Sequence, residues 1–175
     1  MQNPFTLTFG KSPLEPVERP LQTMEIVDTF TAETVNQQMF IITGVRGSGK
    51  TVMMTEIARQ LREREDWVVI ELNPAADLLQ GMLAKLNSNT VCAAIIKSAK
   101  IDLSFFGFGV AIEGVPPLTD TETAIITILE KLKKQDKRLL ITIDEVTNND
   151  YMKVFAGSFQ IFVRQDLPVF LLSTG

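Results

Sequence analysis

Apolar residues gather in four short runs, and each run is followed by turn residues or by a segment of helical period. The runs cover residues 39–43, 67–72, 138–143 and 169–172. Short, continuous apolar runs are typical of strands that are buried on both faces of a sheet. We therefore expect four buried strands at these positions.

Most of the segments between the runs carry apolar residues at helical spacing. The predicted helices cover residues 21–30, 50–65, 77–86, 120–134 and 149–165, with a shorter one at 90–99. In the helix at 120–134, Ile125, Ile128 and Leu132 fall on one face, and Thr119 or Asp120 suits the N-cap. Strands that alternate with helices predict parallel pairing. The expected fold is therefore α/β, a three-layer αβα sandwich with a mostly parallel sheet.

Residues 87–117 have a different pattern. On either side of Phe106-Gly107, apolar residues alternate with others, as Ile101/Leu103/Phe105 and as Phe108/Val110/Ile112. Alternation is the period of a half-buried strand. The pattern predicts a β-hairpin, inserted beside the main sheet.

A glycine-rich loop joins the first predicted strand to the helix at 50–65. Its sequence is Gly44-Val45-Arg46-Gly47-Ser48-Gly49-Lys50-Thr51. It matches the phosphate-loop motif G-x-x-x-x-G-K-[S/T] at every fixed position, between a strand and a helix as the motif requires. Amides of the loop and of Val52 would hold phosphates, Lys50 would add a charge at the outer phosphates, and the Thr51 hydroxyl would bind Mg²⁺. The loop predicts a site for ATP with Mg²⁺, and Arg46 would also touch phosphate unless it faces solvent, as variable loop positions usually do.

Polar residues end two further strands at the same edge of the sheet, where open α/β sheets bind ligands. Asp144 and Glu145 follow the strand at 138–143. We expect Asp144 to hold Mg²⁺. Glu145, which strand alternation would point the other way, is expected to take a proton from the attacking water as general base. Ser173 and Thr174 end the last strand, where a hydroxyl could hold the attacking water or the outermost phosphate; the alternative is that both are satisfied strand-end hydroxyls.

Composition narrows the chemistry. The chain has no histidine and a single cysteine, Cys92, which excludes a histidine general base, an intrachain disulfide and a cysteine-based zinc site. Its formal net charge of −4 gives no general attraction to nucleic acid or to an anionic membrane. No apolar run approaches the ~20 residues of a membrane helix, and the N-terminus lacks the layout of a secretory signal. We expect a cytoplasmic protein without membrane contact.

Together these motifs resemble the AAA+ and related STAND classes of P-loop ATPase, in particular bacterial and archaeal ATPases that are similar to origin-recognition proteins. The resemblance rests on residues 44–51 as Walker A, 140–145 as Walker B and 169–175 as the strand that ends in sensor 1. It implies the strand order 5-1-4-3-2, with the fifth strand absent from this fragment. It also implies that the segment around Arg19 and Pro20 lines the adenine.

Members of that class continue past sensor 1 with an arginine finger, a fifth strand and a helical lid. The resemblance therefore implies that this chain is the core of a longer protein. Residues 1–38 would form a lead-in and helix, and residues 39–175 the nucleotide-binding core, with the insertion at about 87–117. The expected function is Mg²⁺-dependent ATP hydrolysis, slow in this fragment, that drives a conformational switch. Protein or DNA partners would bind through other regions, and exchange of ATP for ADP could control oligomer formation.

Two other functions stay open on the sequence alone. A nucleotide-dependent interaction module would bind ATP without significant turnover and use residues 87–117 as its partner surface. A small-molecule kinase would share the phosphate loop but need an acceptor pocket and an arginine-rich lid, and no such lid is evident. A GTPase is disfavoured, because the chain has no Asn-Lys-x-Asp motif to bind guanine.

Overall fold

The computed structural model describes residues 20–109 and 111–175, and within them four strands form one sheet. The strands are β1 (Met39–Ile42), β2 (Trp67–Leu72), β3 (Arg138–Ile143) and β4 (Val169–Thr174). Every pairing is parallel, and the order across the sheet is β1-β4-β3-β2. The predicted α/β class is confirmed. The five-stranded order 5-1-4-3-2 stays a prediction, because it concerns one strand more than this sheet contains.

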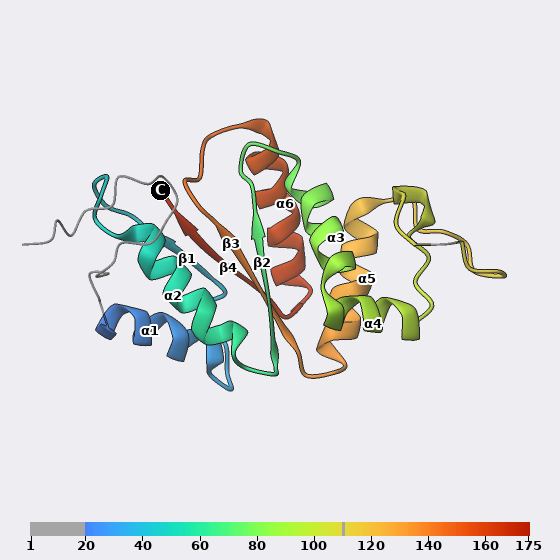
Figure 1. Cartoon of the computed structure of the whole chain (residues 1–175), viewed down its shortest axis with the longest axis horizontal. Coiled ribbons are helices and arrows are strands. Elements are labelled where there is room, and N and C mark those ends of the chain that lie inside the picture. Colours follow the sequence, from blue (N-terminus) through green and yellow to red (C-terminus); the bar gives the residue numbers. More distant parts are fainter. Residues whose placement is uncertain (1–19, 110) are drawn as a thin grey trace, which may run out of the picture.

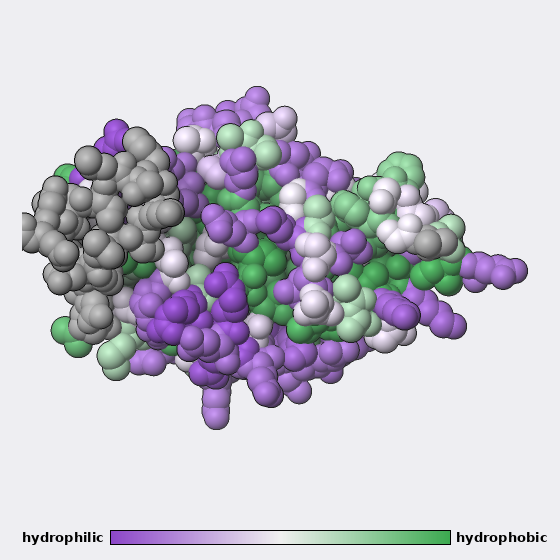
Figure 2. All heavy atoms as spheres, viewed as in Figure 1, coloured by the Kyte–Doolittle hydropathy of each residue, from purple (hydrophilic) through white to green (hydrophobic). Residues whose placement is uncertain are grey.

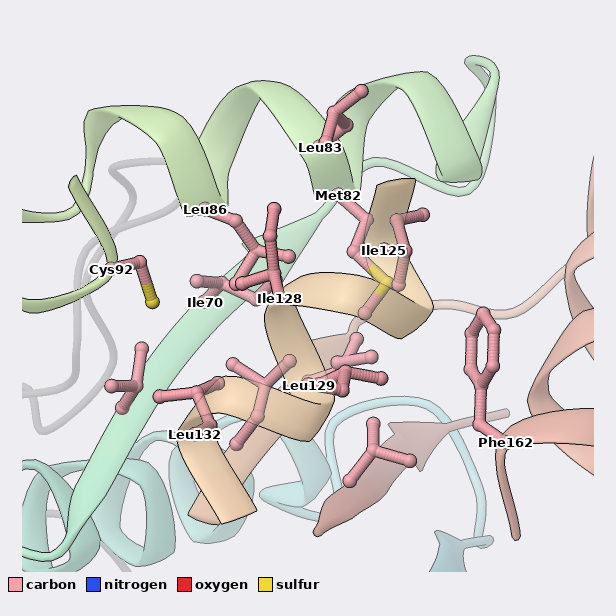
Figure 3. Close-up of a cluster of buried hydrophobic side chains, with 14 of the residues drawn as sticks. Ile70, Met82, Leu83, Leu86, Cys92, Ile125, Ile128, Leu129, Leu132 and Phe162 are labelled. Carbon is pink, nitrogen blue, oxygen red and sulfur yellow. The ribbon is translucent and has the colours of Figure 1, made fainter. Parts of the chain in front are cut away.

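Helices cover both faces of the sheet, as Figure 1 shows. They are α1 (Pro20–Thr31), α2 (Lys50–Arg62), α3 (Leu78–Ser88), α4 (Thr90–Ser98), α5 (Thr121–Lys133) and α6 (Asp150–Arg164). On one face, α1 and α2 enclose a core that includes Phe30 and Ile57. On the other face, α3, α5 and α6 contribute Leu83, Ile128 and Phe162 to a larger core, part of which is drawn in Figure 3. No helix in the two described ranges has both the length and the apolar character that crossing a bilayer needs.

Side-chain caps explain where four of the helices begin. The capping residues of α3, α4, α5 and α6 are Asp77, Asn89, Asp120 and Asn149, and each side chain accepts a backbone N–H of the first turn. Helix α2 differs, because it begins after Gly49, which has a left-handed φ of 82° and no side chain to cap the helix. A ligand can therefore take the role at α2 that a cap plays in the other helices.

The β-hairpin that the alternation predicted within 87–117 is wrong. The described residues of this segment contain no strand, and α4 is followed by a loop with a 3-10 turn at Ser104–Phe106. The physical reason lies at Asp102, whose side chain is buried. Its carboxylate oxygens accept the amides of Ser104 at 2.9 Å and Ile112 at 2.8 Å. A side chain that bonds nearby amides offers the backbone an alternative to a strand ladder.

The apolar residues of this segment divide between core and surface. Ile101 and Leu103 are buried, whereas Phe105 is 63% exposed. Gly107 turns the chain with a left-handed φ of 78°. Val110, which was part of the predicted hairpin, lies outside the described residues. The alternation therefore marks a loop that is anchored by some of its apolar side chains rather than a strand with one buried face.

Candidate active site

Three segments that are far apart in the sequence meet at the carboxyl edge of the sheet. The loop at 44–51 follows β1, Asp144 follows β3, and Thr174 ends β4. Because β4 lies between β1 and β3, its last residue stands between the loop and Asp144. Figure 1 shows these strand ends together with the start of α2. Open α/β sheets bind their ligands at this edge.

The glycine-rich loop folds back over its own lysine. The ammonium nitrogen of Lys50 donates to the carbonyl oxygens of Gly44 at 2.8 Å and Val45 at 3.2 Å. Gly47 and Gly49 both have φ of 82°, a conformation that residues with a side chain rarely adopt. The first half of the loop is exposed. An anionic ligand can therefore reach the loop, and a phosphate would replace carbonyl oxygens as the partner of Lys50.

Thr51 connects the loop to the end of β3. Its hydroxyl oxygen lies 3.1 Å from both carboxylate oxygens of Asp144. From the other side, the hydroxyl of Thr174 donates to Oδ1 of Asp144 at 2.5 Å. One carboxylate is thus held between a hydroxyl from α2 and a hydroxyl from β4.

The comparison with protein families bears directly on this arrangement. The sequence matches the family described as AAA ATPase domain over residues 15–159. That range contains both the glycine-rich loop and Asp144, which Thr51 joins in space. The chain belongs to the AAA ATPase domain family. Membership of this family supports ATP binding and hydrolysis as the general activity. It also confirms that the chain resembles P-loop ATPases. A comparison with curated proteins finds no match.

Oxygen ligands suited to Mg²⁺ lie together in this AAA domain. The Thr51 hydroxyl and the Asp144 carboxylate are hard donors of the kind that Mg²⁺ uses alongside water and phosphate. No group of three or more histidine, cysteine or acidic side chains that could hold a metal occurs within residues 20–109 and 111–175. An ion at this place would take its remaining ligands from water and phosphate, as Mg²⁺ in nucleotide sites usually does. The residues present therefore fit a magnesium–nucleotide complex.

Glu145 directly follows Asp144, but the alternation of β3 does not set the direction of its side chain. Strand β3 ends at Ile143, and Glu145 has a left-handed φ of 53°. Its backbone N–H donates to the hydroxyl oxygen of Thr174 at 2.8 Å. The side chain is exposed, so a water molecule can reach its carboxylate. In this AAA domain the turn after β3, rather than the strand, determines where the candidate base lies.

The structure separates the two predicted strand-end hydroxyls. Leu171 packs in the core under α3, α5 and α6, whereas Leu172 packs in the core under α1 and α2. Because side chains alternate along β4, Ser173 faces the first of these sides and Thr174 faces the side of α2. Thr174 therefore lies beside Asp144, whereas Ser173 is buried on the other side of the sheet.

Several predicted ligand contacts remain predictions. Arg19 lies outside the described residues, and of Pro20 only the backbone at the start of α1 is described. Arg46 is exposed within the loop, as a variable position would be, while Ser48 is half-buried. Val52 belongs to the first turn of α2, where its amide can serve an anion whatever its side chain does.

A cavity beside Asp144 was not foreseen from the sequence. It measures about 490 Å³, and its lining residues are Glu71, Leu72, Asn73, Pro74, Lys85 and Asp144. The sequence does hold a signal, because Glu71 and Asn73 lie at the end of β2, next to the end of β3 that Asp144 follows. The candidate nucleotide site of this AAA domain thus borders a second polar space on the side of β2.

Proposed function

We propose that this domain binds Mg²⁺-ATP and hydrolyses it to ADP and phosphate. The observation that carries the proposal is the contact between Thr51 and Asp144, with 3.1 Å between the hydroxyl and each carboxylate oxygen. It joins the loop that would hold the phosphates to the carboxylate that would hold the metal. When bound, Mg²⁺ would neutralise charge on the outer phosphates.

The remaining chemistry falls to residues of the chain itself. Amides of the loop and of the start of α2 would bind the phosphates, and Lys50 would exchange its bonds to Gly44 and Val45 for an outer phosphate oxygen. Glu145 would take one proton from a water molecule. The water oxygen would then bond to the terminal phosphorus while the bond from that phosphorus to the bridging oxygen of ADP breaks. The accessible position of Glu145 at the sheet edge supports this role.

The proposed role of hydrolysis is a conformational switch in a larger protein of the AAA+ or STAND type, similar to origin-recognition ATPases. The Walker B pair Asp144-Glu145 and the hydroxyl at the end of β4 support that subclass. Protein or DNA partners would bind through other regions, and nucleotide exchange could control oligomer formation.

One observation favours the interaction module as a second candidate. Phe105 is 63% exposed on the loop between α4 and α5. Figure 2 shows hydrophobic residues at the end of the molecule that carries this loop. A module of this kind would bind ATP with the same loop but would not depend on Glu145.

Calorimetry and a turnover assay on three variants test the proposal. With Mg²⁺-ATP at 100 times its Kd, the wild-type domain should gain about 2.7 kcal/mol of stability, or roughly 5–10 °C in Tm. Lys50→Ala should lose this gain. Glu145→Gln should keep it while turnover falls at least ~100-fold.

Lys153→Ala is the matched control, because Lys153 is an exposed lysine that pairs with the neighbouring Asp150 at 3.1 Å on α6, away from the loop. It should change neither quantity. Absence of Mg²⁺-ATP binding by the wild-type domain would contradict the proposal. Equal turnover by the wild type and Glu145→Gln would favour the interaction module.

A further inference from the structure

The loop between α4 and α5 is closed at its base and displays Phe105. The Asp102 carboxylate accepts the amides of Ser104 and Ile112, and the Asp102 carbonyl oxygen accepts the amide of Leu118 at 3.0 Å. Phe105 lies within the part of the loop that these bonds enclose, and its side chain is exposed. A loop that is already tied in this way loses little conformational entropy when it meets a partner.

Phe105 is supported on one side by the neighbouring ring. The ring centroids of Phe105 and Phe106 are 5.4 Å apart with perpendicular planes, and Phe106 packs against the core under α3, α5 and α6. Figure 2 shows apolar residues gathered at this end of the molecule. Aromatic side chains that are held rigidly and left exposed are the usual anchors of protein interfaces. The loop therefore presents one apolar ring, and residues 103–118 contain a single charged residue, Glu113.

A groove of about 510 Å³ lies between α4 and the turn after α5. It is lined from α4 by Val91, Ala94 and Ile95, and from the turn by Gln135 and Lys137. Ala94 is small and exposed, so the groove has room for a ring above this helix. None of the described residues that line the groove is acidic. The groove therefore suits an apolar group that a cation can approach.

The loop and the groove are chemically complementary. The face of an aromatic ring attracts cations, and the groove offers the ammonium of Lys137 beside apolar side chains. That ammonium donates to the carbonyl of Glu65 at 3.0 Å, which fixes its position. Lys97 is exposed on α4 and can pair with the carboxylate of Glu113 from another molecule. Because Phe105 is exposed, it does not fill the groove of its own molecule, and a second copy supplies the ring that the groove suits.

We propose that two copies of this domain associate through the loop and the groove, with Phe105 of each copy in the groove of the other. The loop follows α4 directly, so both surfaces lie at one end of the molecule, as a contact with two-fold symmetry requires (Figure 1). Each half of the contact is one ring in one groove, so the interface is small and the expected Kd is ~10–100 µM. Gln135 and Lys137 precede β3, at the edge of the sheet opposite to the candidate nucleotide site. Association should therefore be the same with and without Mg²⁺-ATP.

Sedimentation velocity without nucleotide, at concentrations that span this Kd, measures the association. Phe105→Ser removes the ring and should raise Kd at least ~10-fold, as the loss of an interface anchor does. Ala94→Arg fills the groove from an exposed helix position and should raise Kd by at least ~10-fold as well. Tyr151→Ser is the matched control, because Tyr151 is an exposed aromatic residue at the start of α6, outside both surfaces. Its Kd should stay within about twofold of wild type.

A mixture of two variants separates the contact from a general effect on folding. Phe105→Ser keeps the groove and Ala94→Arg keeps the ring. One ring-in-groove contact can therefore form between the two variants, although neither can form one with itself. The mixture should associate at least ~3-fold more tightly than either variant alone.

Three results would overturn the proposal. The first is a wild type that stays monomeric at these concentrations, which would leave Phe105 to a different partner. The second is a dimer that Phe105→Ser and Ala94→Arg leave unchanged or that forms only with Mg²⁺-ATP, and the third is a mixture that gains nothing. A domain that dimerises through Phe105 but binds no ATP would instead contradict the proposed function alone.

Discussion

The ammonium of Lys50 donates to the carbonyl of Gly44 at 2.8 Å, so the glycine-rich loop is closed by the side chain that would later meet phosphate. Gly44 also has little room for a side chain. Its φ is 155°, and a Cβ added there would lie 2.9 Å from Oγ of Ser48. The first residue of the loop therefore has both a backbone and a steric reason to be glycine.

Gly44→Ala should weaken Mg²⁺-ATP binding by at least ~10-fold. The added methyl group forces either the backbone or Ser48 to move, and a shift in the loop moves the amides that would bind phosphate. Calorimetric titration with Mg²⁺-ATP measures the change. Wild-type affinity in this variant would show that the loop can reorganise without loss.

Gly157→Ala provides the contrasting case. Gly157 lies inside α6, and a Cβ there would meet no atom within 4 Å. Alanine in a helix interior is more stable than glycine by about 0.5–1 kcal/mol, so the free energy of unfolding should rise by that amount. Urea denaturation measures it, and nucleotide affinity should stay unchanged because α6 carries none of the proposed phosphate contacts. A lower free energy of unfolding would mean that the added methyl group meets a steric obstacle at this position.

Thr51 should couple ATP affinity to Mg²⁺. Its hydroxyl lies 3.1 Å from both Asp144 oxygens, so Thr51→Val removes a proposed metal ligand and its link to the carboxylate. We expect the variant to bind ATP equally well in Mg²⁺ and in EDTA, whereas wild-type affinity should fall when the metal is removed.

Two variants serve as controls for Thr51→Val. Thr51→Ser keeps the hydroxyl and should keep the dependence on Mg²⁺. Thr55→Val alters a threonine one turn later on α2, whose hydroxyl bonds the carbonyl of Thr51 at 2.7 Å, and should also keep it. Dependence on Mg²⁺ in Thr51→Val equal to that of wild type would remove Thr51 from the metal site.

Arg138 joins the sheet to the end of α1, and lysine should not replace it. Its guanidinium lies 5.9 Å from the ring centre of Trp67 and 5.8 Å from that of Phe170. It also donates to the carbonyls of Phe30 at 2.5 Å and Ala32 at 3.1 Å. A lysine has no planar group to stack and no fixed pair of donors, so Arg138→Lys should cost about 1–3 kcal/mol of unfolding free energy.

Urea denaturation of Arg138→Lys measures this cost, and the exposed Arg164 at the end of α6 provides the control. Arg164→Lys should change stability by less than about 0.5 kcal/mol, as surface substitutions usually do. Similar small effects for both variants would mean that α1 is held by its apolar contacts alone.

Much of this fold was predictable because single local rules decide it. Buried parallel strands need apolar residues on both faces, and residues 139–143 supply them at every position except Thr142. The loop at 44–51 was predictable because its mechanism dictates both residue types and spacing. The meeting of Thr51 and Asp144 then followed, since both stand at the carboxyl edge of one parallel sheet.

Other features of the fold and the site depend on contacts between residues that are far apart in the sequence, and no local rule predicts such contacts. Nothing in the sequence Asp-Glu-Val indicates that Glu145 adopts a φ of 53°, because the turn is held by Thr174 from a strand that follows much later. The prediction of a β-hairpin in residues 87–117 failed for a similar reason. In the sequence, Asp102 is a polar residue between apolar neighbours, and nothing marks it as special. In the structure, its carboxylate accepts the amide of Ile112 and so closes a loop.

That loop should respond to acid through Asp102. Hydrogen bonds from the Ser104 side chain and from the amides of Ile112 and Ser104 hold the pKa of Asp102 below its ordinary value of 3.8. A carboxyl whose pKa is lower in the folded state stabilises the fold fully above its unfolded pKa. That stabilisation is lost as the pH falls through the lowered folded pKa. Asp102→Asn removes the charge and turns an amide donor toward one of the backbone donors, so it should lower Tm at neutral pH.

The pH dependence of the difference in Tm between wild type and Asp102→Asn tests this argument. The difference should be constant between about pH 5 and 7 and should narrow below about pH 4, where Asp102 of the unfolded chain takes up a proton before Asp102 of the folded chain does. Asp120 also has a lowered pKa, because of hydrogen bonds from Thr123, but it titrates in both proteins and cancels in the difference. Asp28→Asn, at an exposed carboxylate of α1, should show no comparable change. A difference that stays constant down to about pH 2.5 would mean that the asparagine side chain fails for its shape alone and that the charge of Asp102 contributes nothing.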